Sequence, residues 1–86
     1  MISYKKEFLK FWQLDETDYI ECWMPKCFRQ SVDLHHIYGR LGRLLNDPFN
    51  LIPLCRQCHQ ASHSKEILDQ QSEIVRNKIL EKELRI

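Results

Sequence analysis

The sequence predicts a small α+β domain in which short strands lie between helices near the two ends of the chain, with a zinc ion as a stabilising element. Helical periodicity is confined to the ends of the 86-residue chain, extended segments stand between them, and four cysteines form two closely spaced pairs. A domain of this size has a marginal hydrophobic core, which a structural metal commonly supplements. Because there is no internal repeat or linker, we expect one domain over residues 1–86.

The first expected element is an amphipathic helix at about residues 4–14, where Phe8, Leu9, Phe11 and Trp12 alternate with charged residues. The polar run 15–18 ends it, and residues 19–23 form a short extended piece. Between the first two cysteines, Pro25 favours a tight turn because its φ angle is preset and it has no N–H to satisfy.

The central segment predicts a strand over residues 31–38, a glycine-containing loop over 39–42 and a turn at 46–48. Residues 51–54 are apolar and extended, and Pro53 restricts them to an edge or irregular strand. From Cys58 onward the pattern is helical, as one helix or two, with the main helix at about 64–84. Its apolar stripe consists of Ile67, Leu68, Ile74, Val75, Ile79, Leu80 and Leu84.

We expect this stripe to pack on the N-terminal helix of the same chain, so that the protein is a monomer. The alternative is a dimer formed through the C-terminal helix, because two pairs of the stripe repeat at seven-residue spacing.

Composition indicates a cytoplasmic globular protein. The hydrophobic fraction of 43% is ordinary, no apolar run is long enough for a membrane span, and residues 1–7 lack the apolar stretch of a secretory signal. In a reducing compartment, paired cysteines serve as thiolate ligands more often than as disulfides.

The charges are unevenly distributed along the chain. Residues 22–65 carry six Lys and Arg against two acids, whereas the flanks carry seven against ten, so a net charge of +1 conceals a positive centre. This balance favours a polyanionic partner at the centre, and ordinary surface charge is the alternative interpretation.

The cysteines form a Cys22-x4-Cys27 pair and a Cys55-x2-Cys58 pair. Such short spacings let two thiolates of one loop bind one tetrahedral ion, and four thiolates complete a structural zinc site. A redox role for the second pair would leave the first pair unexplained.

The histidines suggest a second, catalytic metal site. His59 and His63 are four residues apart, so on a helix their rings would lie on one face, and His35 or His36 could add a third ligand. Three protein ligands with an open position are typical of a catalytic metal. Because neighbouring residues of a strand face opposite sides, His35 and His36 need separate roles, one at the metal and one at the water. Ordinary surface or core histidines are the alternative.

Together these motifs resemble the HNH endonuclease family, and more narrowly its subset with a four-cysteine zinc site beside the active site. The resemblance lies in Asp33-Leu34-His35-His36-Ile37, Asn50-Leu51-Ile52-Pro53-Leu54-Cys55 and Cys58-His59, within residues 22–63. It implies the ββα-metal fold, a small hairpin followed by a helix around one divalent metal ion.

The resemblance also implies residue roles. His36 would be the general base, and Asn50 would tie the intervening loop to the strand that carries it. His35 and His59 would bind the metal, with His63 as an additional ligand as in colicin-type members, or in contact with phosphate. The metal would be Mg²⁺, Mn²⁺, Ni²⁺ or Zn²⁺. A histidine at position 35, where many relatives have aspartate, favours the last three.

The implied activity is hydrolysis of phosphodiester bonds in DNA, double-stranded in our interpretation. Arg40 and Arg43 would contact phosphates, with solvated loop charge as the alternative. Since little chain lies outside the nuclease core, we expect weak sequence preference or targeting by a partner protein, by analogy with nucleases of phage packaging or recombination. The competing hypothesis is a non-catalytic zinc-binding module that contacts nucleic acid or protein, and a thiol redox protein is a more distant one.

Overall fold

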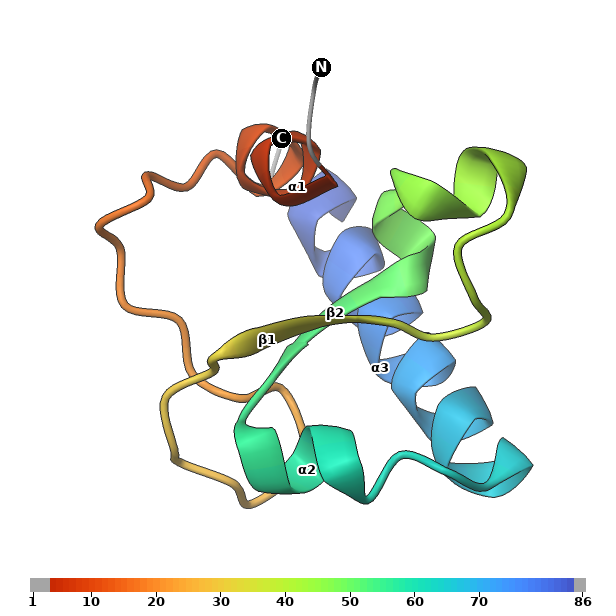
Figure 1. Cartoon of the computed structure of the whole chain (residues 1–86). Coiled ribbons are helices and arrows are strands. Elements are labelled where there is room, and N and C mark those ends of the chain that lie inside the picture. Colours follow the sequence, from red (N-terminus) through yellow and green to blue (C-terminus); the bar gives the residue numbers. More distant parts are fainter. Residues whose placement is uncertain (1–3, 85–86) are drawn as a thin grey trace.

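A two-stranded antiparallel sheet forms the centre of the computed structural model, which describes residues 4–84 (Figure 1). Strand β1 (Asp33–His36) pairs with β2 (Leu51–Leu54) so that Asp33 lies opposite Leu54 and His36 opposite Leu51. The connection contains two 3₁₀ turns, η1 (Gly42–Leu45) and η2 (Pro48–Asn50), and helix α2 (Arg56–Gln60) follows β2 directly. This hairpin and helix confirm the expected α+β class and agree with the ββα-metal fold.

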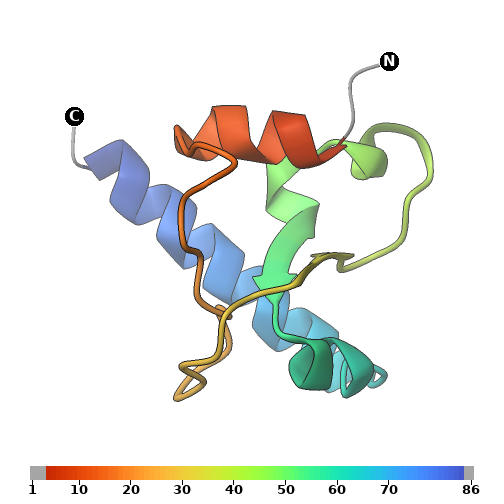
Figure 2. The ribbon, with the colours of Figure 1, turned by 60° about the vertical axis from the view of Figure 1, so that its left-hand side comes forward.

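Helices α1 (Tyr4–Trp12) and α3 (Lys65–Leu84) pack against the hairpin from different directions (Figure 2). Beyond Trp12, Gln13 adopts a left-handed φ of 58°, and the Leu14 N–H donates to the Leu9 carbonyl at 2.8 Å. This C-terminal capping arrangement ends α1 about two residues earlier than the sequence suggested. The start of the chain, on which the expectation about a secretory signal depends, lies partly outside the described residues.

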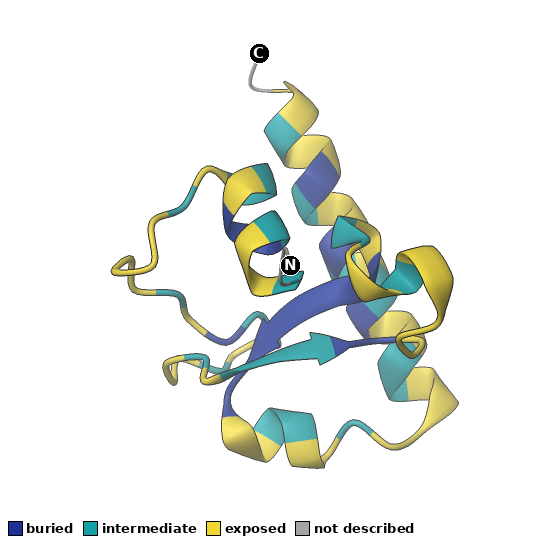
Figure 3. Cartoon of the chain, turned by 45° about the horizontal axis from the view of Figure 1, so that its top comes forward, coloured by how far each residue is buried: buried dark blue, intermediate teal, exposed yellow. Residues whose placement is uncertain are grey.

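Strand β2 is the most deeply buried element (Figure 3). Leu51 packs with Phe8 and Leu9 of α1, whereas Ile52 and Leu54 pack in a second cluster with Val75 and Ile79 of α3. Burial of such side chains contributes about 1.5–3 kcal/mol each. Both flanking helices therefore fix the strand that leads into α2.

Pro53 is compatible with β2 because each strand of a two-stranded sheet has a free edge. Its backbone carbonyl accepts a hydrogen bond from the Trp23 N–H at 3.1 Å, which ties the first cysteine loop to the sheet. The expected edge position of this proline is thus confirmed.

Helix α3 packs on its own chain, as expected. Val75 and Ile79 are buried, and the Lys82 ammonium lies 4.8 Å from the centre of the Phe11 ring of α1. The predicted stripe is too long, however: Leu84 is 83% exposed and Leu80 is also exposed. Between residues 4 and 84, no helix has both the length and the apolar character that a bilayer span requires.

Candidate functional site

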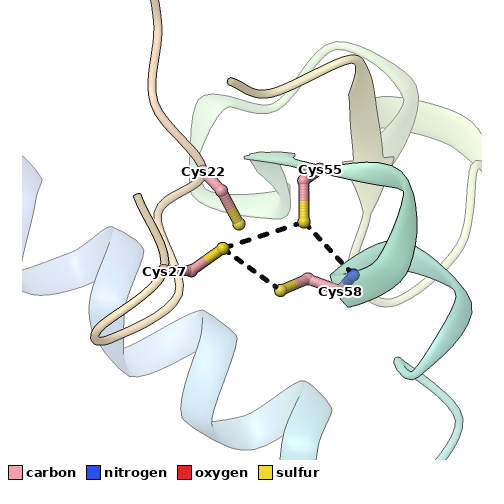
Figure 4. A group of neighbouring side chains, drawn as sticks. All are labelled: Cys22, Cys27, Cys55 and Cys58. Carbon is pink, nitrogen blue, oxygen red and sulfur yellow. Dashed lines mark hydrogen bonds between the residues drawn. The ribbon is translucent and has the colours of Figure 1, made fainter. Parts of the chain in front are cut away.

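The four cysteines converge between the hairpin and the loop that precedes it (Figure 4). Cys22 and Cys27 come from the loop, Cys55 from the end of β2 and Cys58 from α2, and their sulfur atoms all lie within 4.8 Å of one another. All four are free thiols. Four sulfur ligands at this spacing suit a tetrahedral zinc ion, so the residues fit the structural metal that the sequence suggested.

Local backbone geometry explains this convergence. Lys26 adopts a left-handed φ of 62°, and the Cys27 N–H donates to the Met24 carbonyl at 3.2 Å, which closes the turn between the first two cysteines. In the second pair, the Cys55 sulfur caps α2 by accepting from the Cys58 N–H at 3.4 Å.

The surroundings shift the thiol pKa values in opposite directions. The Cys58 N–H lowers the pKa of Cys55 to about 6, whereas burial raises the pKa values of Cys22 and Cys58. Cys55 therefore forms a thiolate near neutral pH more readily than Cys22 or Cys58, and a bound cation would stabilise the ligands as thiolates.

A second cluster lies on one face of β1, where alternation places Asp33 and His35 on the same side. The rings of His35 and His59 lie 4.8 Å apart between centroids, and the Asp33 Oδ2 atom is 2.9 Å from His59 Nδ1. The His35 Nε2 atom is buried without a hydrogen-bond partner. Burial, followed by the nearby His59 and His36, lowers the pKa of His35 to about 4, so its imidazole is neutral and able to bind a metal.

His63 does not join this cluster. Helix α2 ends at Gln60, and the Ser62 hydroxyl donates to the Cys58 carbonyl at 2.7 Å as the chain turns toward α3. The expectation that His59 and His63 share one helix face is therefore wrong, because the helix stops before His63, which is exposed. Within residues 4–84, the cysteines form the one group with three or more clustered metal-ligand atoms.

His36 points to the opposite face of β1 from His35 and is 7% exposed. Its Nε2 atom lies 3.0 Å from the Leu45 carbonyl oxygen, which can only accept, so Nε2 carries the proton. Nδ1 is then the basic nitrogen, and it is buried without a hydrogen-bond partner. Burial lowers the pKa of His36, and Arg40 adds to this shift, although the Leu45 carbonyl opposes it.

Asn50 holds the loop that carries this carbonyl. Its side-chain oxygen accepts from the Tyr38 N–H at 2.8 Å, and its amide nitrogen donates to the Gly39 and Leu44 carbonyls at 2.8 and 2.9 Å. Asn50 thereby joins the end of β1 to the 39–45 loop. Its side chain makes these three hydrogen bonds while the residue is only 2% exposed to solvent. The Leu45 carbonyl that orients His36 directly follows the residue clamped by Asn50.

Arg40 and Arg43 are both exposed on this loop, and the Arg40 guanidinium lies 5.5 Å from the centre of the Tyr4 ring. The Tyr4 ring in turn packs edge-on against His36, with centroids 4.5 Å apart. A cavity of about 440 Å³ has Tyr4, Arg40, Asp33 and His59 among its lining residues. Asp33 and Leu34 of β1 line this cavity but His35 and His36 do not, so the cavity adjoins the strand at its Asp33 end.

Sequence reasoning missed one feature of this site and one feature of the adjoining cavity. Asp33 was part of the motif without a role, although its two-residue spacing from His35 on a strand would have placed both on one face. The cavity is also lined by the acidic residues Asp15, Glu16 and Asp18. The sequence did not suggest this, because their position depends on the path of the chain after α1.

A family model described as HNH endonuclease matches residues 20–65, more than half of the chain. No curated protein and no solved structure matches the chain. The matched region contains both cysteine pairs, the hairpin and α2. The chain therefore belongs to the HNH endonuclease family, and its clustered cysteines are consistent with the four-cysteine members.

Proposed function

We propose that this protein is a metal-dependent endonuclease that hydrolyses DNA phosphodiester bonds, with His36 as the general base. The observation that carries the proposal is the orientation of His36: the bond from Nε2 to the Leu45 carbonyl leaves Nδ1 as the basic nitrogen. Membership of the HNH endonuclease family supports the same reaction class.

In the proposed reaction, His36 Nδ1 takes a proton from a water molecule. The water oxygen forms a bond to phosphorus in line with the departing 3′ oxygen, the bond from phosphorus to that oxygen breaks, and a proton from a solvent water molecule completes the 3′ hydroxyl. The lowered pKa of His36 keeps its imidazole neutral near pH 7, as a base requires. Since Nδ1 is buried, substrate binding or a side-chain movement must open a path for water.

His35 and His59 would hold the divalent metal, Mg²⁺, Mn²⁺, Ni²⁺ or Zn²⁺. The unpartnered Nε2 atom of His35 beside the His59 ring supports this assignment. Such a metal would stabilise negative charge on the phosphate and the leaving oxygen. His63 would join only if residues 61–64 move toward the cavity, and Cys22, Cys27, Cys55 and Cys58 would bind the structural zinc.

Double-stranded DNA is the substrate that we propose. Arg40, which lines the cavity, and Arg43 on the same loop are exposed and would hold phosphates, contacts that position a duplex without reading its sequence. We accordingly propose weak sequence preference or targeting by a partner protein in the cytoplasm, with the monomer as the active species. The packing of Val75 and Ile79 within the chain supports the monomer.

A non-catalytic zinc-binding module is the second candidate function. One observation favours it: among residues 4–84 only the cysteines form a group of three or more clustered metal ligands. The two candidates differ in metal content, because the module requires one tightly bound zinc and the nuclease requires a further, weaker divalent site.

The test is incubation of supercoiled plasmid with the zinc-loaded protein and each of the four divalent metals. We expect nicked or linear DNA with at least one metal, and a loss of about 10²–10⁴-fold in rate for His36→Ala, the usual contribution of a positioned acid or base. Zinc content and thermal unfolding should match the wild type in that variant.

Cleavage by His36→Ala at the wild-type rate would reject the assigned base. A folded, zinc-loaded wild type that cuts DNA with none of the metals would instead favour the binding module.

A further inference from the structure

The side chain of Asp33 connects β1 to α2 at the candidate metal site. Its Oδ2 atom lies 2.9 Å from His59 Nδ1 and 2.9 Å from Arg56 Nε, and its Oδ1 atom accepts from Arg56 Nη2 at 3.3 Å. Asp33 is the least exposed of the three side chains, with 22% against 39% for His59 and 65% for Arg56. The carboxylate is therefore held by a two-point contact with Arg56 while it contacts the histidine.

This contact determines which nitrogen of His59 can bind a metal. An ionised carboxylate only accepts hydrogen bonds, so Nδ1 of His59 must carry a proton. In a neutral imidazole, Nε2 then holds the free electron pair. In metal-binding histidines, a hydrogen bond from the ring nitrogen that does not bind the metal fixes the ring orientation and raises the basicity of the other nitrogen.

His35 supplies the neighbouring half of the arrangement. It shares a face of β1 with Asp33, and its ring lies 4.8 Å from that of His59 at an interplanar angle of 53°. The His35 Nε2 atom is buried without a partner. One strand therefore carries both a metal-ligand candidate and the residue that orients the second ligand on α2.

We propose that Asp33 is a positioning residue that holds His59 as the Nδ1–H tautomer, so that His59 Nε2 and His35 can share one divalent ion. Arg56 fixes the Asp33 carboxylate in this orientation. The proposal rests on the proposed function, because it adds a supporting residue to the same metal site.

The first test reads the tautomer directly, in zinc-loaded protein without a second metal. Long-range ¹H–¹⁵N spectra of ¹⁵N-labelled histidine distinguish protonated from unprotonated ring nitrogens. We expect the Nδ1–H form of His59 in the wild type and a mixture dominated by Nε2–H in Asp33→Ala. A wild-type His59 in the Nε2–H form would overturn the proposal, whether or not the protein cuts DNA.

The second test is Mn²⁺ titration followed by paramagnetic broadening, since Mn²⁺ prefers oxygen and imidazole ligands and leaves zinc–thiolate sites intact. We expect Asp33→Ala to bind Mn²⁺ about 10–100-fold more weakly, the usual cost of removing such a supporting partner. Arg56→Gln should give a smaller loss, and Asp33→Glu should restore part of the affinity.

Glu16→Ala is the matched control, because Glu16 lines the same cavity and its substitution removes the same charge. Its Mn²⁺ affinity should stay within about twofold, since screening weakens an exposed charge that makes no direct contact. Equal losses in Asp33→Ala and Glu16→Ala would show a general charge effect and overturn the positioning role.

The two proposals can fail separately. Wild-type protein that cleaves DNA and binds Mn²⁺, with unchanged affinity in folded Asp33→Ala, would overturn the positioning role and leave the nuclease intact. Wild-type protein that binds none of Mg²⁺, Mn²⁺, Ni²⁺ and Zn²⁺ beyond the zinc of the cysteine site would overturn the second metal site itself, and the positioning role with it.

Discussion

The cysteine site and the histidine site lie next to each other but are built differently. Four sulfur atoms approach one another within 4.8 Å, whereas the histidines are divided among the two faces of β1, helix α2 and the segment after α2. Cys22 and Cys55 are buried, while His59 is only partly buried and His63 is exposed. The closed set suits a metal that stabilises the fold, and the open set leaves room for substrate.

The adjacent pair Cys58 and His59 connects the two sites. Both residues belong to α2, a helix of five residues whose N-terminal cap is the Cys55 sulfur. An isolated helix of this length has no stability of its own. The position of His59 therefore depends in part on the cysteine that caps its helix.

The largest expected effect follows from loss of a cysteine ligand. Serine is a good helix cap, so Cys55→Ser keeps the capping group and removes the thiolate. Structural zinc sites contribute about 10–16 kcal/mol near pH 7, which exceeds or matches the about 5–15 kcal/mol stability of a typical domain. We expect zinc loss, unfolding at room temperature by circular dichroism, and no cleavage.

If Cys55→Ser remained folded without zinc, the cysteine cluster would not be the stabilising site. Chelation of zinc from the wild type offers an independent check, and it should give the same spectral change.

An intermediate effect should separate His59 from His63. We expect His59→Ala to weaken Mn²⁺ binding more than tenfold, because its ring lies beside His35, and His63→Ala to cause a smaller loss. Titration of both zinc-loaded variants under the same conditions provides the comparison. Equal losses would indicate that residues 61–64 rearrange when the metal binds, so that the site is less open than the structure suggests.

The smallest expected effect is on the pH dependence of stability. The pKa of His35 is lowered to about 4 in the folded state, so the unfolded chain takes up a proton first as the pH falls below about 6.5. Stability due to neutral His35 is thus present above pH 6.5 and decreases toward pH 4, by about 1–2 kcal/mol after allowance for solvent screening.

Urea unfolding at pH 7 and pH 5 measures this effect. His35→Gln should lose less stability between the two values than the wild type, and proton competition at the cysteines is common to both proteins. The same pH dependence in both would exclude His35 as its source.

The cysteine site could be predicted from the sequence more completely than the histidine site. Short spacings force Cys22 toward Cys27 and Cys55 toward Cys58. The prediction of one site therefore needed only one further assumption, that the two pairs lie close together in the fold. The His63 position depended on where α2 ends, and helical periodicity did not show that it ends at Gln60. Periodicity likewise placed α3 correctly but could not show that Leu84 extends beyond the core.

The role of Asp33 was not predictable in the same way, because it requires a contact across 26 residues of chain. For Asn50 the role was predictable, but the individual hydrogen-bond partners were not. The family resemblance suggested that Asn50 ties the loop to the strand, but which carbonyls it contacts, those of Gly39 and Leu44, depends on the path of the loop between β1 and β2.

His36 is oriented by a main-chain oxygen, and Asn50 holds the surrounding loop largely through main-chain atoms. Substitutions at Leu41 or Arg43 would therefore change the proposed DNA-contacting surface while His36 keeps its tautomer, whereas Arg40 also influences the pKa of His36. If the proposed function holds, this separation makes Leu41 and Arg43 suitable positions to engineer substrate preference: variants could be selected for new DNA contacts with His36 left in place.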